Sequence, residues 1–135
     1  MRFIHFGWIA ILACAALTGC GGNPRLNAKG RVVKGGQPYT VPAGDYVRVT
    51  FYELTPDGGT GKNSYAATFD NADGTFRAVG PDGRGIPPGK YRICVEHESK
   101  RRDLFKGAYN TDTTPFVFDI DSRTTELVID LDRKS

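Results

Sequence analysis

Apolar and polar residues alternate one by one in several short runs of this chain, and this period of two is the feature that most constrains the fold. Around Val47, Val49 and Phe51, for example, every second side chain is apolar, and clusters of Gly, Pro and Asp separate the runs. Such alternation is typical of half-buried strands. The runs that we predict to be strands are 30–34, 46–54, 64–70, 75–79, 91–98, 116–120 and 125–131. Seven strands in a domain of this size predict an all-β fold, a seven-stranded antiparallel β-sandwich.

The first residues have a different composition from the rest of the chain. Arg2 is followed by an almost unbroken apolar run over 9–17, and all 15 acidic residues of the chain come after position 20. A basic start, a short apolar stretch and then small residues are typical of a secretory signal. The apolar run is too short for a spanning helix, which needs about 20 residues. We therefore expect this segment to be removed from the mature protein.

Leu17-Thr18-Gly19-Cys20 resembles the bacterial lipobox. This resemblance implies cleavage before Cys20, a diacylglycerol on its thiol and often a further acyl chain such as palmitate on its new amine. Two or more chains hold a protein stably on a membrane. The predicted organisation is a lipoprotein signal peptide over 1–19, a lipidated tether over 20–28 and a β-sandwich domain over 29–135. The expected location is the cell envelope, and Gly21 after the cysteine favours the outer membrane.

Turn and strand-entry motifs in the domain resemble those of the carboxypeptidase regulatory-like, or transthyretin-like, family. The matching segments are a G-x-V opening with Gly-Gln-Pro in 30–38, an Asp-Gly turn in 70–76, a Pro-Pro-Gly-Lys-Tyr entry in 85–91 and the tail 109–131. The turn before Asp73-Gly74 is one residue longer than the family pattern. The likeness covers about 29–131 and implies a prealbumin-like sandwich, usually without catalytic activity.

The same fold family also hosts purine-degrading hydrolases and iron-dependent ring-cleaving dioxygenases. Their sites use several histidines, whereas removal of the signal peptide leaves only His97 here. We therefore expect no enzyme, but a membrane-tethered envelope lipoprotein that acts as a binding or structural module. The lipid anchor makes the membrane one partner, and an envelope protein or polysaccharide is a candidate for another. Without Arg2 the exported chain has 17 basic and 15 acidic residues, and this net charge of +2 argues against nucleic acid.

Two surface features have alternative interpretations. Lys100, Arg101, Arg102 and Lys106 form the one dense basic run, which is either a solvated loop or a contact for an anionic surface. Tyr39, Tyr52 and Tyr109 would form a stacking platform for carbohydrate if they were exposed and coplanar. That arrangement would make the protein a carbohydrate-binding module.

Other motifs predict no metal or cofactor. The loop 70–74 lacks the later Glu of a calcium loop and favours a turn in which Asp and Asn bond their own backbone. Segment 58–62 only faintly resembles a phosphate loop and joins two strands. Glu96 and Glu98 face away from His97 on a strand, and a catalytic zinc needs three protein ligands, so we expect a solvated His97. Cys94, with no paired base, is expected to be a structural thiol.

Overall fold

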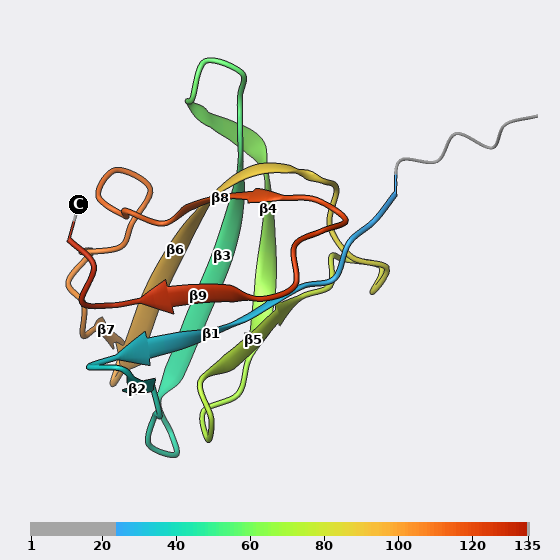
Figure 1. Cartoon of the computed structure of the whole chain (residues 1–135). Coiled ribbons are helices and arrows are strands. Elements are labelled where there is room, and N and C mark those ends of the chain that lie inside the picture. The colour runs from blue at the N-terminus through green and yellow to red at the C-terminus, as the bar shows by residue number, and fades with distance from the viewer. Residues whose placement is uncertain (1–23, 135) are drawn as a thin grey trace, which may run out of the picture.

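The computed structural model describes residues 24–134, which form an all-β domain (Figure 1). No helix occurs in this range, so none there could cross a bilayer. The predicted all-β class is confirmed, and each predicted run overlaps one of the seven longer strands. The strands are β1 (Ala28–Lys34), β2 (Gln37–Pro38), β3 (Tyr46–Leu54), β4 (Thr60–Phe69), β5 (Thr75–Ala78), β6 (Gly89–Ser99), β7 (Arg102–Asp103), β8 (Val117–Ile120) and β9 (Leu127–Asp130).

Hydrogen bonds join the strands into one continuous sheet that folds back on itself as two layers. The strand order is β2-β1-β5-β4-β3-β6-β7, with β9 paired to β1 and β8 paired to β6. Strand β4 belongs to both layers, because its residues up to Ala67 pair with β3 while Thr68 and Phe69 pair with β5. One layer therefore holds β9, β1 and β5, the other holds β3, β6 and β8, and the core lies between them (Figure 1).

One strand pair departs from the antiparallel expectation. Strand β9 runs parallel to β1, with Gly30 opposite Leu127 and Val33 opposite Asp130. The chain crosses from β8, at the edge of one layer, to β9, at the edge of the other. Strand β8 runs against β6, and β6 has the same direction as β1 along the sheet. The reversal between β8 and β9 therefore leaves β9 parallel to β1.

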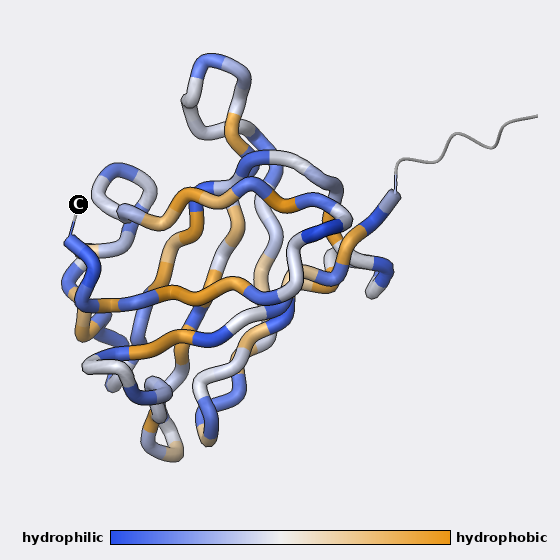
Figure 2. Tube along the Cα trace, in the orientation of Figure 1, coloured by the Kyte–Doolittle hydropathy of each residue, from blue (hydrophilic) through white to orange (hydrophobic). Residues whose placement is uncertain are grey.

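Every second residue of the longer strands enters the core. The burial alternates along β1, β3, β5 and β9, and Figure 2 shows hydrophobic residues interspersed with hydrophilic ones along β3. Full burial of an aliphatic or aromatic side chain contributes about 1.5–3 kcal/mol to stability, so this face dominates the folding energy. The largest fully buried side chains are Tyr91, Phe51, Phe116, Ile86, Ile93, Ile129, Val32, Val47, Val49 and Val95.

Gly30 is required by the close approach of β9 to β1. A Cβ at this position would lie 2.1 Å from the carbonyl oxygen of Leu127 and 2.6 Å from Cζ of Phe76. No side chain fits at those distances, because van der Waals contacts between heavy atoms begin near 3.5 Å. The glycine therefore allows the ring of Phe76 and the backbone of β9 to meet over β1.

The ordered domain begins before the boundary predicted from the sequence. Leu26 forms a bridge with Ile86, in which each backbone N–H donates to the other's carbonyl at 2.8 Å. Ala28, the first residue of β1, is 3% exposed. Leu26 and Ala28, which we assigned to the tether, are therefore part of the domain. The predicted signal peptide and Cys20 lie outside the described residues.

Candidate functional site

The predicted basic run forms an exposed turn, which we call the basic turn (residues 100–106). It connects β6 to β7 and includes the short loop after β7. Lys100 and Arg101 have φ values of 49° and 64°, so they form the two-residue hairpin turn that requires positive φ at both central positions. All four of the predicted basic residues, Lys100, Arg101, Arg102 and Lys106, are exposed.

Asp103, the acid nearest to these cations in sequence, holds the turn together. One carboxylate oxygen accepts the backbone N–H groups of His97 at 3.1 Å and Phe105 at 3.0 Å. The other accepts the N–H of Gly107 at 2.8 Å. No salt bridge between Asp103 and a basic residue occurs among residues 24–134. Asp103 therefore stabilises the turn through backbone hydrogen bonds and does not pair with the basic side chains of the turn.

Sequence reasoning missed the apolar part of this turn. Leu104 is 52% exposed, one of the few large hydrophobic side chains on the surface of the described domain. It follows Arg102-Asp103 and precedes Phe105, whose ring packs against the core cluster. The sequence signal for Leu104 is a single apolar residue in a segment without strand alternation. The charged residues on both sides of it drew attention away from this residue. Basic residues next to an exposed apolar side chain suit a surface whose outer groups are anionic and cover an apolar layer.

The basic turn lies at the end of the domain opposite to the first described residues. Strands β1 and β6 have the same direction along the sheet, and the Leu26–Ile86 bridge lies just before both of them. The 11 residues of β6 then extend about 33 Å, at about 3.3 Å per residue, from this bridge toward the turn. Figure 1 shows the chain entering at one end and β7 at the other.

The expectation of a solvated His97 is wrong. The side chain continues the inward face of β6 and is 4% exposed. Its Nε2 lies 2.9 Å from Oδ2 of Asp45, and its Nδ1 lies 2.6 Å from the hydroxyl oxygen of Tyr39. An ionised carboxylate only accepts hydrogen bonds, so Nε2–H donates to Asp45, while Nδ1 and the Tyr39 hydroxyl share the second hydrogen bond. Both partners come from the β2–β3 connection, which the sequence pattern did not place next to β6.

This buried network perturbs the groups around the imidazole. The hydroxyl of Ser99 donates to Oδ1 of Asp45 at 2.8 Å, and this bond and that from His97 lower the pKa of the Asp45 carboxyl. Burial raises the pKa of Tyr39, with smaller contributions from the nearby Tyr109 and Asp45. Among residues 24–134, every buried side-chain nitrogen and oxygen has a hydrogen-bond partner. The hydrogen bonds of this network therefore hold β6 against the β2–β3 connection and satisfy the polar groups buried between them.

The three tyrosines proposed as a stacking platform do not form one. Tyr39 and Tyr109 are half-buried, and each packs edge-on or tilted against Phe105, with ring centroids 5.7 and 5.2 Å apart. The hydroxyl of Tyr109 donates to the carbonyl of Leu131 at 2.6 Å. Tyr52 lies on the outer face of β3, because its neighbour Phe51 faces the core. The rings of Tyr39 and Tyr109 therefore pack against the core, and only Tyr52 lies on an outer face.

The remaining motifs have structural roles. Asp70 and Asp73 accept the backbone N–H groups of Ala72 and Thr75, at 2.8 and 2.9 Å, in the turn that we expected. Cys94 is 7% exposed, and burial raises its pKa to about 11, which fits a structural thiol. Glu96 and Glu98 bind Arg48 on the outer face, away from His97. Segment 58–62 forms the turn between β3 and β4 and the start of β4.

The chain matches no family model, no curated protein and no solved structure among those with which it was compared.

Proposed function

We propose that this protein is a non-catalytic lipoprotein of the cell envelope, a binding module attached to the membrane at two points. The lipid on Cys20 is the first point, and the basic turn is the second. The observation that carries this proposal is a hydrogen-bonded turn with four exposed cations close in sequence to the exposed Leu104. The resemblance of 17–20 to a lipobox supplies the anchor.

The energetics favour a membrane surface for this turn. Each Lys or Arg near an anionic membrane contributes about 1 kcal/mol of attraction. This attraction acts within about 8 Å at physiological salt, so the turn must approach the head groups closely. Leu104 can then insert into the interface, as apolar residues of peripheral membrane segments do. Each contact of the turn with the membrane is weak. Because the lipid anchor holds the domain at the membrane, the effective concentration of the turn there is high enough for weak contacts to form.

The distance between the two points is compatible with one membrane. The six residues from Cys20 to Leu26 span at most about 20 Å when extended. The turn lies about 33 Å beyond the Leu26–Ile86 bridge, as the length of β6 indicates. Both points therefore reach the same bilayer when the long direction of the domain lies along it. In this orientation the domain stays close to the membrane instead of extending from it.

The enzyme alternative has less support. His97 is the one histidine after position 5, and both of its ring nitrogens are hydrogen-bonded to Tyr39 and Asp45 inside the domain. A dioxygenase or hydrolase site that used this ring would need to break that network.

Substitution of Cys20 tests the anchor. Cys20→Ser should abolish the incorporation of labelled fatty acid and release the protein from isolated membranes, because the acceptor thiol is gone. The wild type and a Cys94→Ser variant, which keeps Cys20, should both be labelled. Acylation and membrane sedimentation of the Cys20→Ser protein would contradict the anchor.

Vesicle binding tests the second point without the lipid. A protein that begins at Pro24 is first shown to fold by a strand-dominated circular dichroism spectrum. Its Kd for phosphatidylglycerol vesicles is then measured by sedimentation. Replacing all four basic residues of the turn with Gln should weaken binding at least tenfold, and added salt should weaken the wild type in the same way. The control variant replaces two exposed cations elsewhere, Lys62 and Arg123, with Gln.

Three results are informative in this experiment. Retained binding by the control variant and lost binding by the turn variant support the proposal. Equal binding of the wild type and the turn variant at low salt contradicts it. Loss of binding to a soluble acidic polysaccharide, but not to the vesicles, in the turn variant contradicts the membrane as the partner of this turn.

A further inference from the structure

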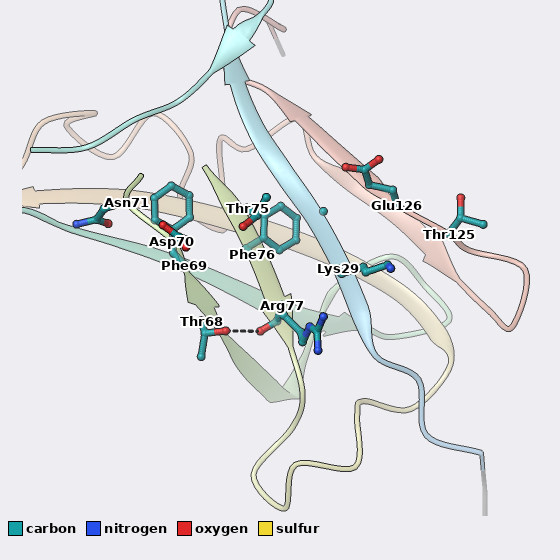
Figure 3. Close-up of a pocket in the computed structure, with 11 residues that line it drawn as sticks. Lys29, Thr68, Phe69, Asp70, Asn71, Thr75, Phe76, Arg77, Thr125 and Glu126 are labelled. Atoms are coloured by element: carbon teal, nitrogen blue, oxygen red, sulfur yellow. Dashed lines mark hydrogen bonds between the residues drawn. The ribbon is translucent and has the colours of Figure 1, made fainter. Parts of the chain in front are cut away.

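An open hollow lies over the layer formed by β1, β5 and the end of β4, and none of the basic-turn residues lines it. Its volume is about 1060 Å³, and residues just before β9 form one rim. Figure 3 shows side chains from these separate strands gathered around it. Its polar lining includes Lys29, Arg77, Thr68, Thr75, Asn71 and Thr125.

Two cations of the hollow lie directly opposite each other. Lys29 of β1 and Arg77 of β5 are register partners in the antiparallel pair. Like charges at directly opposed positions destabilise a sheet, because their Cβ atoms are only about 5 Å apart. Neither cation forms a salt bridge within residues 24–134. The free protein therefore contains an electrostatic repulsion that an anion would relieve.

The acidic side chains of the hollow do not neutralise these cations. Glu126 pairs with Arg31, with 3.7 Å between Nε and Oε1. Asp70 accepts the backbone N–H of Ala72 in its own turn. Both carboxylates are thus bound elsewhere.

Uncharged hydrogen-bonding groups also line the hollow. The hydroxyl of Thr68 donates to the carbonyl of Arg77, as Figure 3 shows, and that of Thr75 donates to Asp73. Each hydroxyl oxygen keeps acceptor capacity. Asn71 donates its amide N–H to the carbonyl of Asp45 and keeps its side-chain oxygen as an acceptor. Acceptors of this kind suit a ligand that carries many hydroxyl groups.

We propose that this hollow binds an acidic oligosaccharide, with a sugar carboxylate at Lys29 and Arg77 and sugar hydroxyls at the rim. Carboxylates bind Arg and Lys through charge-assisted hydrogen bonds. The volume lies at the upper end of the roughly 300–1,000 Å³ of small-molecule sites, which favours several sugar rings over one. The open shape allows a polymer to enter and leave. This site is independent of the lipid anchor and of the basic turn.

The test uses the full-length chain in a neutral detergent and isothermal titration calorimetry. The probe is trigalacturonic acid, and the neutral probe is maltotriose. The wild type should bind the acidic trisaccharide at least tenfold more tightly than the neutral one. The Lys29→Gln/Arg77→Gln variant should lose at least tenfold in affinity for it. The Lys62→Gln/Arg123→Gln control and the turn variant with four Gln substitutions should bind as the wild type does.

The melting temperature of the double variant separates binding from folding. It should not fall, because the substitutions remove a repulsion between like charges. If it falls, Lys29→Gln alone carries the test, since this side chain is exposed near the start of β1. Equal affinity for maltotriose, tighter binding of tripolyphosphate or unchanged affinity of the Lys29 and Arg77 variants would overturn the proposal. Loss of binding by the turn variant alone would assign the sugar to the basic turn instead.

Discussion

Replacing His97 with alanine removes the centre of the buried network that joins β6 to the β2–β3 connection. The imidazole is 4% exposed and bonds to Tyr39 at 2.6 Å and Asp45 at 2.9 Å. Two hydrogen bonds contribute about 1 kcal/mol each. The edge-on contacts of the imidazole with Tyr39 and Phe105, at 5.7 and 5.9 Å, contribute about 0.5–1.5 kcal/mol each. We therefore expect His97→Ala to lower the free energy of unfolding by about 3–5 kcal/mol.

Urea denaturation followed by circular dichroism measures this loss on the protein that begins at Pro24. Tyr39→Phe should cost about 1 kcal/mol in the wild type, because it removes one hydrogen bond and keeps the ring. The same substitution should cost almost nothing in the His97→Ala protein, because the hydrogen-bond partner of the Tyr39 hydroxyl is already absent. A loss below about 1 kcal/mol for His97→Ala, or equal costs of Tyr39→Phe in both backgrounds, would refute a structural role for the network.

Three further outcomes are expected in the same unfolding assay. Ile129→Ala, at a fully buried site, should cost about 2–5 kcal/mol, whereas Val128→Ala, 42% exposed next to it, should cost about 0.5 kcal/mol; equal costs would contradict the register of β9. Gly30→Ala should cost about 3 kcal/mol or more, because its Cβ would overlap the Leu127 carbonyl; a neutral effect would contradict the close approach of β9. The lowered pKa of Asp45 contributes stability above the ordinary Asp value of 3.8 that is lost as the pH falls below it, so Asp45→Asn should flatten the acid limb of the stability profile.

The sequence predicts the strands and the faces of this domain because both are local properties. Alternation of side chains assigns Val47, Val49 and Phe51 to the core, and all three are at most 1% exposed. The Gly35-Gly36 pair predicts a hairpin turn, and both residues have positive φ, 59° and 73°. These features depend only on neighbours in the chain.

Long-range pairing explains what the sequence did not predict. The parallel pair of β1 and β9 depends on the crossover between layers, which leaves no local signal. The burial of His97 depends on Tyr39 and Asp45, which are 58 and 52 residues away. The basic turn was identified from its composition, but its conformation depends on Asp103, whose carboxylate accepts three backbone N–H groups. The alternation along β6 already gives His97 the parity of the buried Ile93 and Val95, but it does not show the partners that satisfy a buried imidazole.

Depth of the basic turn in the membrane is the most direct test of two-point attachment. The only tryptophan of the chain is Trp8, in the predicted signal peptide, so Leu104→Trp places a single fluorophore on the turn of the mature protein. The lipidated variant is reconstituted into phosphatidylglycerol-containing vesicles with brominated acyl chains. Val128→Trp, at another exposed apolar position on β9, is the matched control. The account predicts a blue-shifted, strongly quenched emission at position 104 and weaker quenching at position 128. An emission maximum typical of water, with no quenching at position 104, would contradict it.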